Sequence, residues 1–425
     1  MNIISRVEIT GLWDSHDLTV DFHSDINFLI GINGSGKTTV INIIAAALNA
    51  DFPTLDRMPF KRVKIDLAEV NGENKPSIVV EKKQREKLPY PIVEYSIKQK
   101  TSDKPVIFSL DELEEMRAVR GAPRSYYIRH LQLATRSVVD ILKTLVNASW
   151  LSIHRATSPS RPSEERSFES SVDLKLDELS NSFVKFFSAL SKRASDEIQI
   201  FQQELFLSFI RGQSESLFPS VSDLDLEKEK DALIAIFRQF KLQENLFSKH
   251  VENHFELVKQ ATKKLQTDDA SLEMKEIAAL VNASRIQSVV KVWYALLEKH
   301  KKIYEPRDTF FGILNKFLQR KSASITNKNE IEIVTQTKKI LQLRELSSGE
   351  KQLIILLGEA LLQEKRPWIY IADEPELSLH VKWQEILIDS LRTINPYSQI
   401  VFATHSPDIV SSYGNKIFDL ESKLG

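Results

Sequence analysis

The chain has 425 residues, of which 42% are hydrophobic and 27% are charged. This length exceeds what one ordinary hydrophobic core supports, so we expect two or more lobes in a globular protein. The absence of cysteine excludes disulfides, thiolate catalysis and cysteine-based zinc sites. The 57 Lys and Arg residues are balanced by 58 Asp and Glu residues, so any contact with nucleic acid must come from a local basic patch.

The first residues run directly into an alternating strand pattern, and no apolar run is long enough to cross a bilayer. We therefore predict a cytoplasmic protein with no membrane partner.

The N-terminal part of the chain contains several alternating patterns typical of β-strands. Residues 3–30 alternate apolar and polar side chains in short runs, and Asn71-Gly72 marks a turn between two later runs. Further strand candidates are Val63–Leu67, Ile78–Val80, Ile92–Ile97 and Val106–Leu110. These patterns predict a β-rich first lobe.

Helical periodicity dominates the middle of the chain after a short strand candidate at Trp150–Ile153. Apolar residues there recur at steps of three and four, as in Phe183, Phe187 and Leu190, which is typical of helices with a buried face. Asp223 and Asp225 lie in a polar segment and indicate a helix N-terminus rather than a metal site. We predict three segments, namely residues 1–155 and 326–425 as the two parts of one head and residues 156–325 as a helical insertion.

Residues Gly31 to Thr38 read Gly-Ile-Asn-Gly-Ser-Gly-Lys-Thr, between an apolar strand pattern at Ile26–Ile30 and a helical pattern from Val40. This spacing and context are typical of a P-loop, in which backbone N–H groups and a helix N-terminus surround phosphate groups. Lys37 would reach the β- and γ-phosphates, and the Thr38 hydroxyl would hold Mg²⁺. The octapeptide therefore predicts binding of a nucleoside triphosphate.

Three further motifs follow near the C-terminus. Leu346–Gln352 precedes an apolar helix pattern, Ile369–Glu374 is an apolar strand that ends in two carboxylates, and a third apolar strand ends at His405. When two carboxylates lie at a strand end beside a P-loop, one can bind Mg²⁺ and the other can polarise a water molecule.

In this order the motifs resemble the nucleotide-binding domain of ABC-type ATPases, in the branch that includes SMC-like, RecF-like and OLD-like proteins. Gly31–Thr38 resembles the Walker A motif of that family, Leu346–Gln352 its signature, Ile369–Glu374 its Walker B motif and His405 its switch histidine. The resemblance implies an α/β fold, a P-loop NTPase head of ABC type with a β-rich N-terminal lobe, a parallel-sheet core and a largely helical insertion.

The resemblance also implies the roles of individual residues. Thr38 and Asp373 would bind Mg²⁺, Glu374 would activate the attacking water, and His405 would contact the γ-phosphate. The alternative for His405 is a structural histidine at a strand end. ATP would be bound by Asn33, Gly34, Ser35, Gly36, Lys37, Thr38 and Thr39 of one copy and by Ser347, Ser348 and Gly349 of another. The implied assembly is a homodimer of heads, or a higher oligomer.

The chain departs from the transporter pattern in two places. Leu377–His380 stands where transporters carry Ser-Ala-Leu-Asp, and Ser348 replaces a signature glycine, as in the SMC-like and OLD-like branch. The Q-loop glutamine has no secure match, and Gln132 and the strand end at His154-Arg155 are its candidates.

Without a Toprim domain or another nuclease motif, the chain resembles the stand-alone ATPase subunits of bacterial anti-phage systems, such as PtuA-like proteins of Septu and retrons and AriA-like proteins of PARIS. This implies a separate effector, such as a nuclease or Toprim protein. The alternative is a RecF-like or SMC-like clamp of DNA repair or chromosomes that binds DNA directly. DNA or RNA is therefore a possible partner. Local basic runs for such binding are Lys82, Lys83, Arg85 and Lys87, or Arg117, Arg120, Arg124 and Arg129.

Overall fold

The computed structural model describes residues 1–85, 90–109, 124–151, 171–210, 225–266 and 272–423, without the side chains of 124–134, 209 and 210. The chain divides into two compact units. The first contains Met1–Lys185 and Arg307–Gly425, and the second contains Phe186–Pro306. The second unit falls inside the range predicted for the insertion.

An antiparallel six-stranded sheet occupies the N-terminal part of the first unit, in the order β2-β1-β4-β5-β6-β7. The turn predicted at Asn71-Gly72 joins β4 and β5, which pair in register from Arg62–Glu81 to Asp66–Ser77. The predicted β-rich lobe is therefore confirmed. Its strands are β1 (Asn2–Leu12), β2 (His16–Asp21), β4 (Arg62–Glu69), β5 (Ser77–Lys83), β6 (Ile92–Lys98) and β7 (Val106–Ser109).

A parallel five-stranded sheet combines strands from both ends of the chain, in the order β14-β3-β13-β12-β8. N-terminal β3 pairs with C-terminal β13, and β8 pairs with β12. Strands from the two ends of the chain thus form one sheet. The strands are β3 (Ile26–Ile30), β8 (Ala148–Leu151), β12 (Trp368–Asp373), β13 (Ser398–Ala403) and β14 (Ile417–Asp419).

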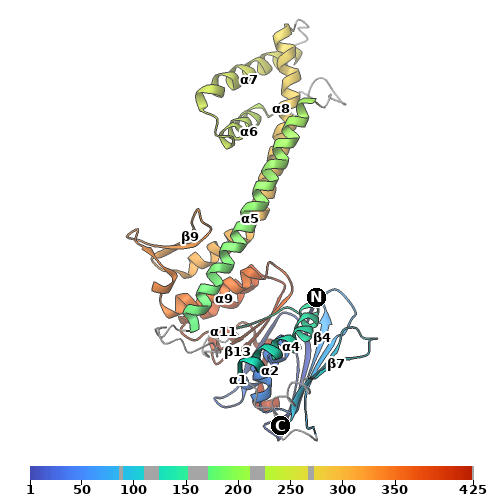
Figure 1. Cartoon of the computed structure of the whole chain (residues 1–425). Helices are drawn as coiled ribbons and strands as arrows, with labels where there is room; N and C mark the ends of the chain where they lie inside the picture. The colour runs from blue at the N-terminus through green and yellow to red at the C-terminus, as the bar shows by residue number, and fades with distance from the viewer. Residues whose placement is uncertain (86–89, 110–123, 152–170, 211–224, 267–271, 424–425) are drawn as a thin grey trace. The chain divides into compact units, whose positions relative to one another are not determined.

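Helix α1 (Lys37–Asn49) packs against β8, β12 and β13 of the parallel sheet, and Figure 1 shows it beside α2 (Phe52–Arg57) and α4 (Arg124–Leu145). Its apolar side chains share one core with β1 and β4 of the antiparallel sheet, through residues such as Ile44, Val7 and Ile65. Ten of its residues are buried, because the helix has core on more than one side. This burial fixes the helix N-terminus at the end of β3.

The C-terminal part of the first unit adds helices and a small sheet. After β11 the chain forms a 3-10 helix, in which the Glu345 carboxylate accepts the Gln342 N–H at 2.7 Å. The elements are β9 (Lys321–Ile325), β10 (Ile331–Thr335), β11 (Ile340–Leu341), η2 (Leu343–Glu345), α9 (Ser348–Leu362), α10 (Val381–Ile394), α11 (Pro407–Val410), η3 (Gly414–Lys416) and α12 (Leu420–Lys423).

The second unit is helical in the part that the structure describes. Its buried apolar residues include a cluster of Phe201, Ile236 and Trp293, as expected for helices with a buried face. Asp225 caps α6, which confirms a helix N-terminus there, while Asp223 lies outside the described residues. The helices are α6 (Leu226–Gln239), α7 (Glu244–Gln266) and the parts of α5 (Ser171–Ile210) and α8 (Met274–Phe317) that belong to this unit. None of the described helices combines the length and apolar content that crossing a bilayer requires.

Candidate active site

The Gly31–Thr38 octapeptide forms the turn between β3 and α1. Gly34 and Gly36 have φ values of +89° and +90°, a region that side chains with a Cβ atom rarely occupy. A Cβ atom on Gly36 would also lie 2.0 Å from the ring of Trp13. Glycine is therefore required at position 36 both by backbone conformation and by space.

Lys37 is only 5% exposed, and its ammonium group folds back over the loop. The Nζ atom donates to the carbonyl oxygens of Gly31 at 2.8 Å and Ile32 at 3.0 Å. Burial lowers the pKa of Lys37, and the carboxylates of Glu374 and Asp373 oppose this shift. A phosphate oxygen could replace these carbonyl acceptors.

Asp373 and Glu374 come at the end of β12, and His405 follows β13. The Thr38 hydroxyl donates to Asp373 Oδ1 at 3.3 Å, and His405 Nε2 lies 3.8 Å from Glu374 Oε1. Strands β3, β13 and β12 are neighbours in the parallel sheet, so their carboxyl ends meet at one edge. A hydroxyl and a carboxylate oxygen at this edge fit Mg²⁺, which prefers oxygen ligands.

A cavity of about 490 Å³ lies over this edge. It is lined by most of the residues predicted to bind ATP in the P-loop, together with Trp13 from the turn between β1 and β2. Ser35 is not among its lining residues, and its buried Oγ lies beside Gly31. The lining residues are Trp13, Asn33, Gly34, Gly36, Lys37, Thr38, Thr39, Glu374 and His405.

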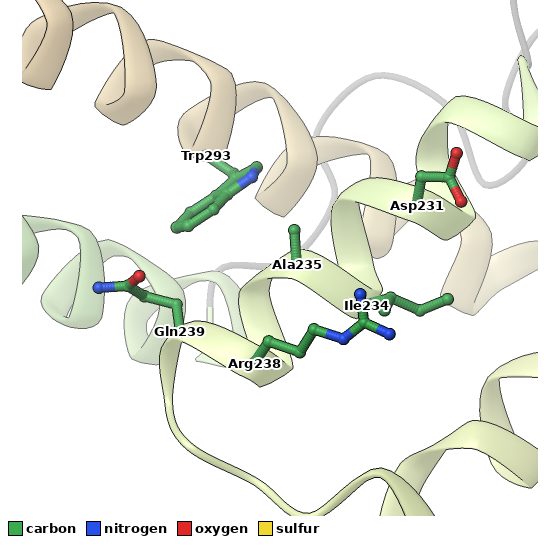
Figure 2. Close-up of a pocket in the computed structure, with 6 residues that line it drawn as sticks. All are labelled: Asp231, Ile234, Ala235, Arg238, Gln239 and Trp293. Carbon is green, nitrogen blue, oxygen red and sulfur yellow. The ribbon is translucent and has the colours of Figure 1, made fainter. Parts of the chain in front are cut away.

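A second cavity, of about 580 Å³, lies in the helical unit (Figure 2). Its lining comes from α6 and from Trp293 of α8. Its cationic side chain, Arg238, donates to the Glu244 carboxylate at 2.6 Å. Since the charge of Arg238 is paired and no phosphate-binding loop lines this cavity, the P-loop cavity is the better candidate for a nucleotide.

The signature motif forms the N-terminus of α9. Ser347 caps this helix through the Glu350 N–H at 3.4 Å, and Glu350 accepts the Ser347 N–H at 3.0 Å in return. Gly349 lies close to the loop between β12 and α10, so a Cβ atom on it would be 2.4 Å from the Ser378 carbonyl oxygen. Ser347 and Ser348 are exposed, and none of the described residues that line the P-loop cavity comes from this motif.

Some sequence-based candidates lie outside the described side chains, namely Gln132, His154, Arg155, Lys87 and the second basic run. In the first basic run, Lys82 donates to the carbonyl oxygens of Asp56 and Met58. Lys83 and Arg85 both pair with Glu94. These three side chains already bond to other groups of the protein, which weakens the prediction that the first basic run binds phosphate.

The strand order of the two sheets, and the P-loop at the carboxyl edge of the parallel sheet, define an α/β P-loop ATPase head of ABC type with a helical insertion. The family model described as AAA ATPase domain matches residues 3–410. The chain therefore belongs to the AAA ATPase domain family and is an ATPase. A search of curated proteins gives no match.

Solved structures similar to the chain include three SMC head domains. One, from Pyrococcus furiosus, has an extended coiled coil and is bound to the C-terminal domain of ScpA; it is 16% identical over 97% of this chain and 92% of that one, with a TM-score of 0.43. Another, from Pyrococcus yayanosii, has a coiled coil and joint and is 14% identical over 97% and 93%, with a TM-score of 0.38. The Thermotoga maritima SMC head is 12% identical over 96% and 91%, with a TM-score of 0.33.

Proposed function

We propose that the P-loop cavity binds ATP with Mg²⁺ and that the residues around it hydrolyse the nucleotide. The loop N–H groups, Lys37 and the N-terminus of α1 would hold the phosphates. Thr38 and Asp373 would hold Mg²⁺, which would neutralise charge on the β- and γ-phosphates. The observation that carries the proposal is the convergence of Lys37, Thr38, Asp373 and Glu374 at one sheet edge.

Glu374 and His405 are the proposed catalytic residues. The Glu374 N–H donates to the Ala403 carbonyl oxygen at 2.8 Å, and this bond fixes the residue beside the next strand. Its carboxylate lines the cavity and would orient or deprotonate a water molecule, while His405 would contact the γ-phosphate. Both side chains are partly exposed, so substrate can reach them.

We further propose that two copies of the chain share each ATP site, with Ser347, Ser348 and Gly349 of one copy closing the P-loop cavity of the other. The motif occupies the N-terminus of a 15-residue helix, where the helix dipole favours an anion. Its two serines are exposed and lie outside the P-loop cavity of their own chain, so they are free to meet a second copy.

The broader role that we propose is ATP-dependent control of a separate effector, such as a nuclease, in a bacterial anti-phage complex. The support is the motif pattern of the OLD-like and SMC-like branch and the absence of nuclease motifs from the sequence. The alternative, a DNA-binding clamp, needs basic side chains that are free to bind phosphate. In the first candidate run Lys82, Lys83 and Arg85 bond within the protein, and the second run lies outside the described side chains. Salt-dependent DNA binding by the purified chain would favour the clamp, whereas stable co-purification with a neighbour-encoded nuclease would favour effector control.

The first test of the nucleotide site is Lys37→Ala. Loss of the ammonium group removes the main charge for the β- and γ-phosphates, so we expect ATP affinity to fall below detection in a fluorescent-nucleotide titration. The matched control is Lys104→Ala, since Lys104 is exposed in the antiparallel lobe. Wild-type affinity in Lys37→Ala would contradict the assignment of this cavity.

The second test separates binding from hydrolysis. In Glu374→Gln the side chain keeps its size but loses the base, so we expect ATP affinity to stay and turnover to fall about 100-fold or more. Phosphate release at saturating ATP measures the turnover, and Glu385→Gln, at an exposed position of α10, serves as control. Equal turnover in Glu374→Gln and wild type would show that Glu374 does not activate water.

A further inference from the structure

Glu376 is a buried carboxylate beside the active site for which the motifs give no role. It is 8% exposed and belongs to the Walker B loop, defined as residues 374–380 between β12 and α10. Residues 404–406, which follow β13, are termed the histidine loop. Burying a charged side chain is costly unless hydrogen bonds compensate, so the partners of Glu376 indicate why it lies there.

The Oε1 atom of Glu376 accepts two hydrogen bonds from the histidine loop. One comes from the Thr404 hydroxyl at 2.6 Å and the other from the backbone N–H of His405 at 2.9 Å. Thr404 is itself fully buried. The second carboxylate oxygen, Oε2, is buried without a hydrogen-bond partner among the described residues. Glu376 therefore directs one oxygen at the backbone of the proposed phosphate-contacting histidine.

A second bridge joins the same two loops on the other side of His405. Gln384 of α10 accepts the Ser406 hydroxyl at 2.6 Å and donates to the Leu379 carbonyl oxygen at 2.9 Å. The Thr404 hydroxyl also accepts the Ser406 N–H at 3.0 Å. Residues on both sides of His405 are thus tied to the Walker B loop, and Glu376 alone of these contacts bonds to His405 itself.

We propose that Glu376 is a positioning residue that sets the backbone of His405 relative to Glu374. The proposal rests on the proposed role of His405 at the γ-phosphate. Glu376 and Glu374 lie on the same short loop, so the carboxylate bond fixes the distance between the water-activating residue and the histidine. Because Oε1 makes both bonds, an amide oxygen can do the same, and the acceptor geometry matters rather than the charge.

The test is a double-mutant cycle on the full chain with four variants: Glu376→Ala, Glu376→Gln, His405→Ala and Glu376→Ala combined with His405→Ala. If Glu376 acts through His405, we expect Glu376→Ala to lower kcat on the order of 10- to 100-fold by misplacing the histidine, with KM within about twofold. The double variant should be no slower than the slower single variant. Glu376→Gln should retain kcat within about threefold of wild type, since the acceptor remains.

Hydrogen exchange gives a readout that does not depend on turnover. The His405 amide should exchange faster in Glu376→Ala than in wild type and stay protected in Glu376→Gln, and Glu385→Ala should change neither exchange nor kcat. Multiplicative losses in the double variant, or wild-type kcat in Glu376→Ala, would overturn the positioning role of Glu376. Either result would leave the proposed role of His405 standing. Wild-type kcat in His405→Ala would overturn the proposed function of the histidine and the positioning role with it.

Discussion

At the scale of single residues, Gly36 and Gly34 offer a matched pair in the phosphate-binding loop. Both have a positive φ, but only Gly36 has a neighbour, the Trp13 ring, where a Cβ atom would lie. We expect Gly36→Ala to abolish ATP binding and Gly34→Ala to weaken it less, because backbone strain of about 1–3 kcal/mol acts in both and a clash is added in one. Titration with a fluorescent ATP analogue checks the difference.

Combining Gly36→Ala with Trp13→Ala separates the two causes. Removal of the indole relieves the clash but leaves the strained φ, so the double variant should bind ATP better than Gly36→Ala alone. An equal effect of alanine at positions 34 and 36 would show that contact with Trp13 is irrelevant.

The residues of the candidate site divide into those that contiguous motifs predict and those that tertiary contacts supply. Lys37, Asp373 and His405 each follow an apolar strand pattern, and parallel pairing of those strands brings them together. Trp13 lies in a turn of another sheet, and Glu376 acts through bonds to a loop far along the chain. No local period or spacing encodes such contacts, so the sequence predicted no role for these two residues.

At the scale of elements, α9 is held by the first turns of α5. Lys351 pairs with Asp173 at 2.8 Å, and Lys175 pairs with Glu359 at 2.9 Å. Gly358 lies against the Phe183 ring, where a Cβ atom would be 2.4 Å from its tip. The apolar pattern of α9 predicted a buried helix, but which helix covers it depends on packing that periodicity alone does not specify.

This contact predicts opposite effects for two helical glycines. Gly358→Ala should destabilise the protein by about 1–3 kcal/mol, because the buried Phe183 ring has little room to move. Gly312→Ala in α8, where a Cβ atom would meet nothing within 4 Å, should stabilise it by about 0.5–1 kcal/mol. Midpoints of thermal unfolding compare the variants, and a raised midpoint in Gly358→Ala would contradict the close packing described here.

At the scale of the whole molecule, both chain ends contribute to one sheet edge. The P-loop comes from the N-terminal part, and the Walker B and histidine loops come from the C-terminal part. The order of the four motifs therefore predicted the head correctly, and parallel pairing of β3 with β13 explains why. The signature does not line the P-loop cavity of its own chain, so in the proposed dimer the signature of a second copy would complete the site.

A mixing experiment tests whether each ATP site draws on two copies. Lys37→Ala disables the P-loop, and Ser347→Arg places a bulky cation at the exposed signature, so we expect either variant alone to lack turnover. A mixed dimer has one site in which both changes meet and one site with neither. If copies exchange freely and sites act independently, an equimolar mixture should recover roughly a quarter of wild-type phosphate release, since half of the pairs are mixed. Ser347→Thr, which keeps the helix cap, controls for damage to α9. No recovery, with both variants folded and pairing, would place each ATP site within a single copy.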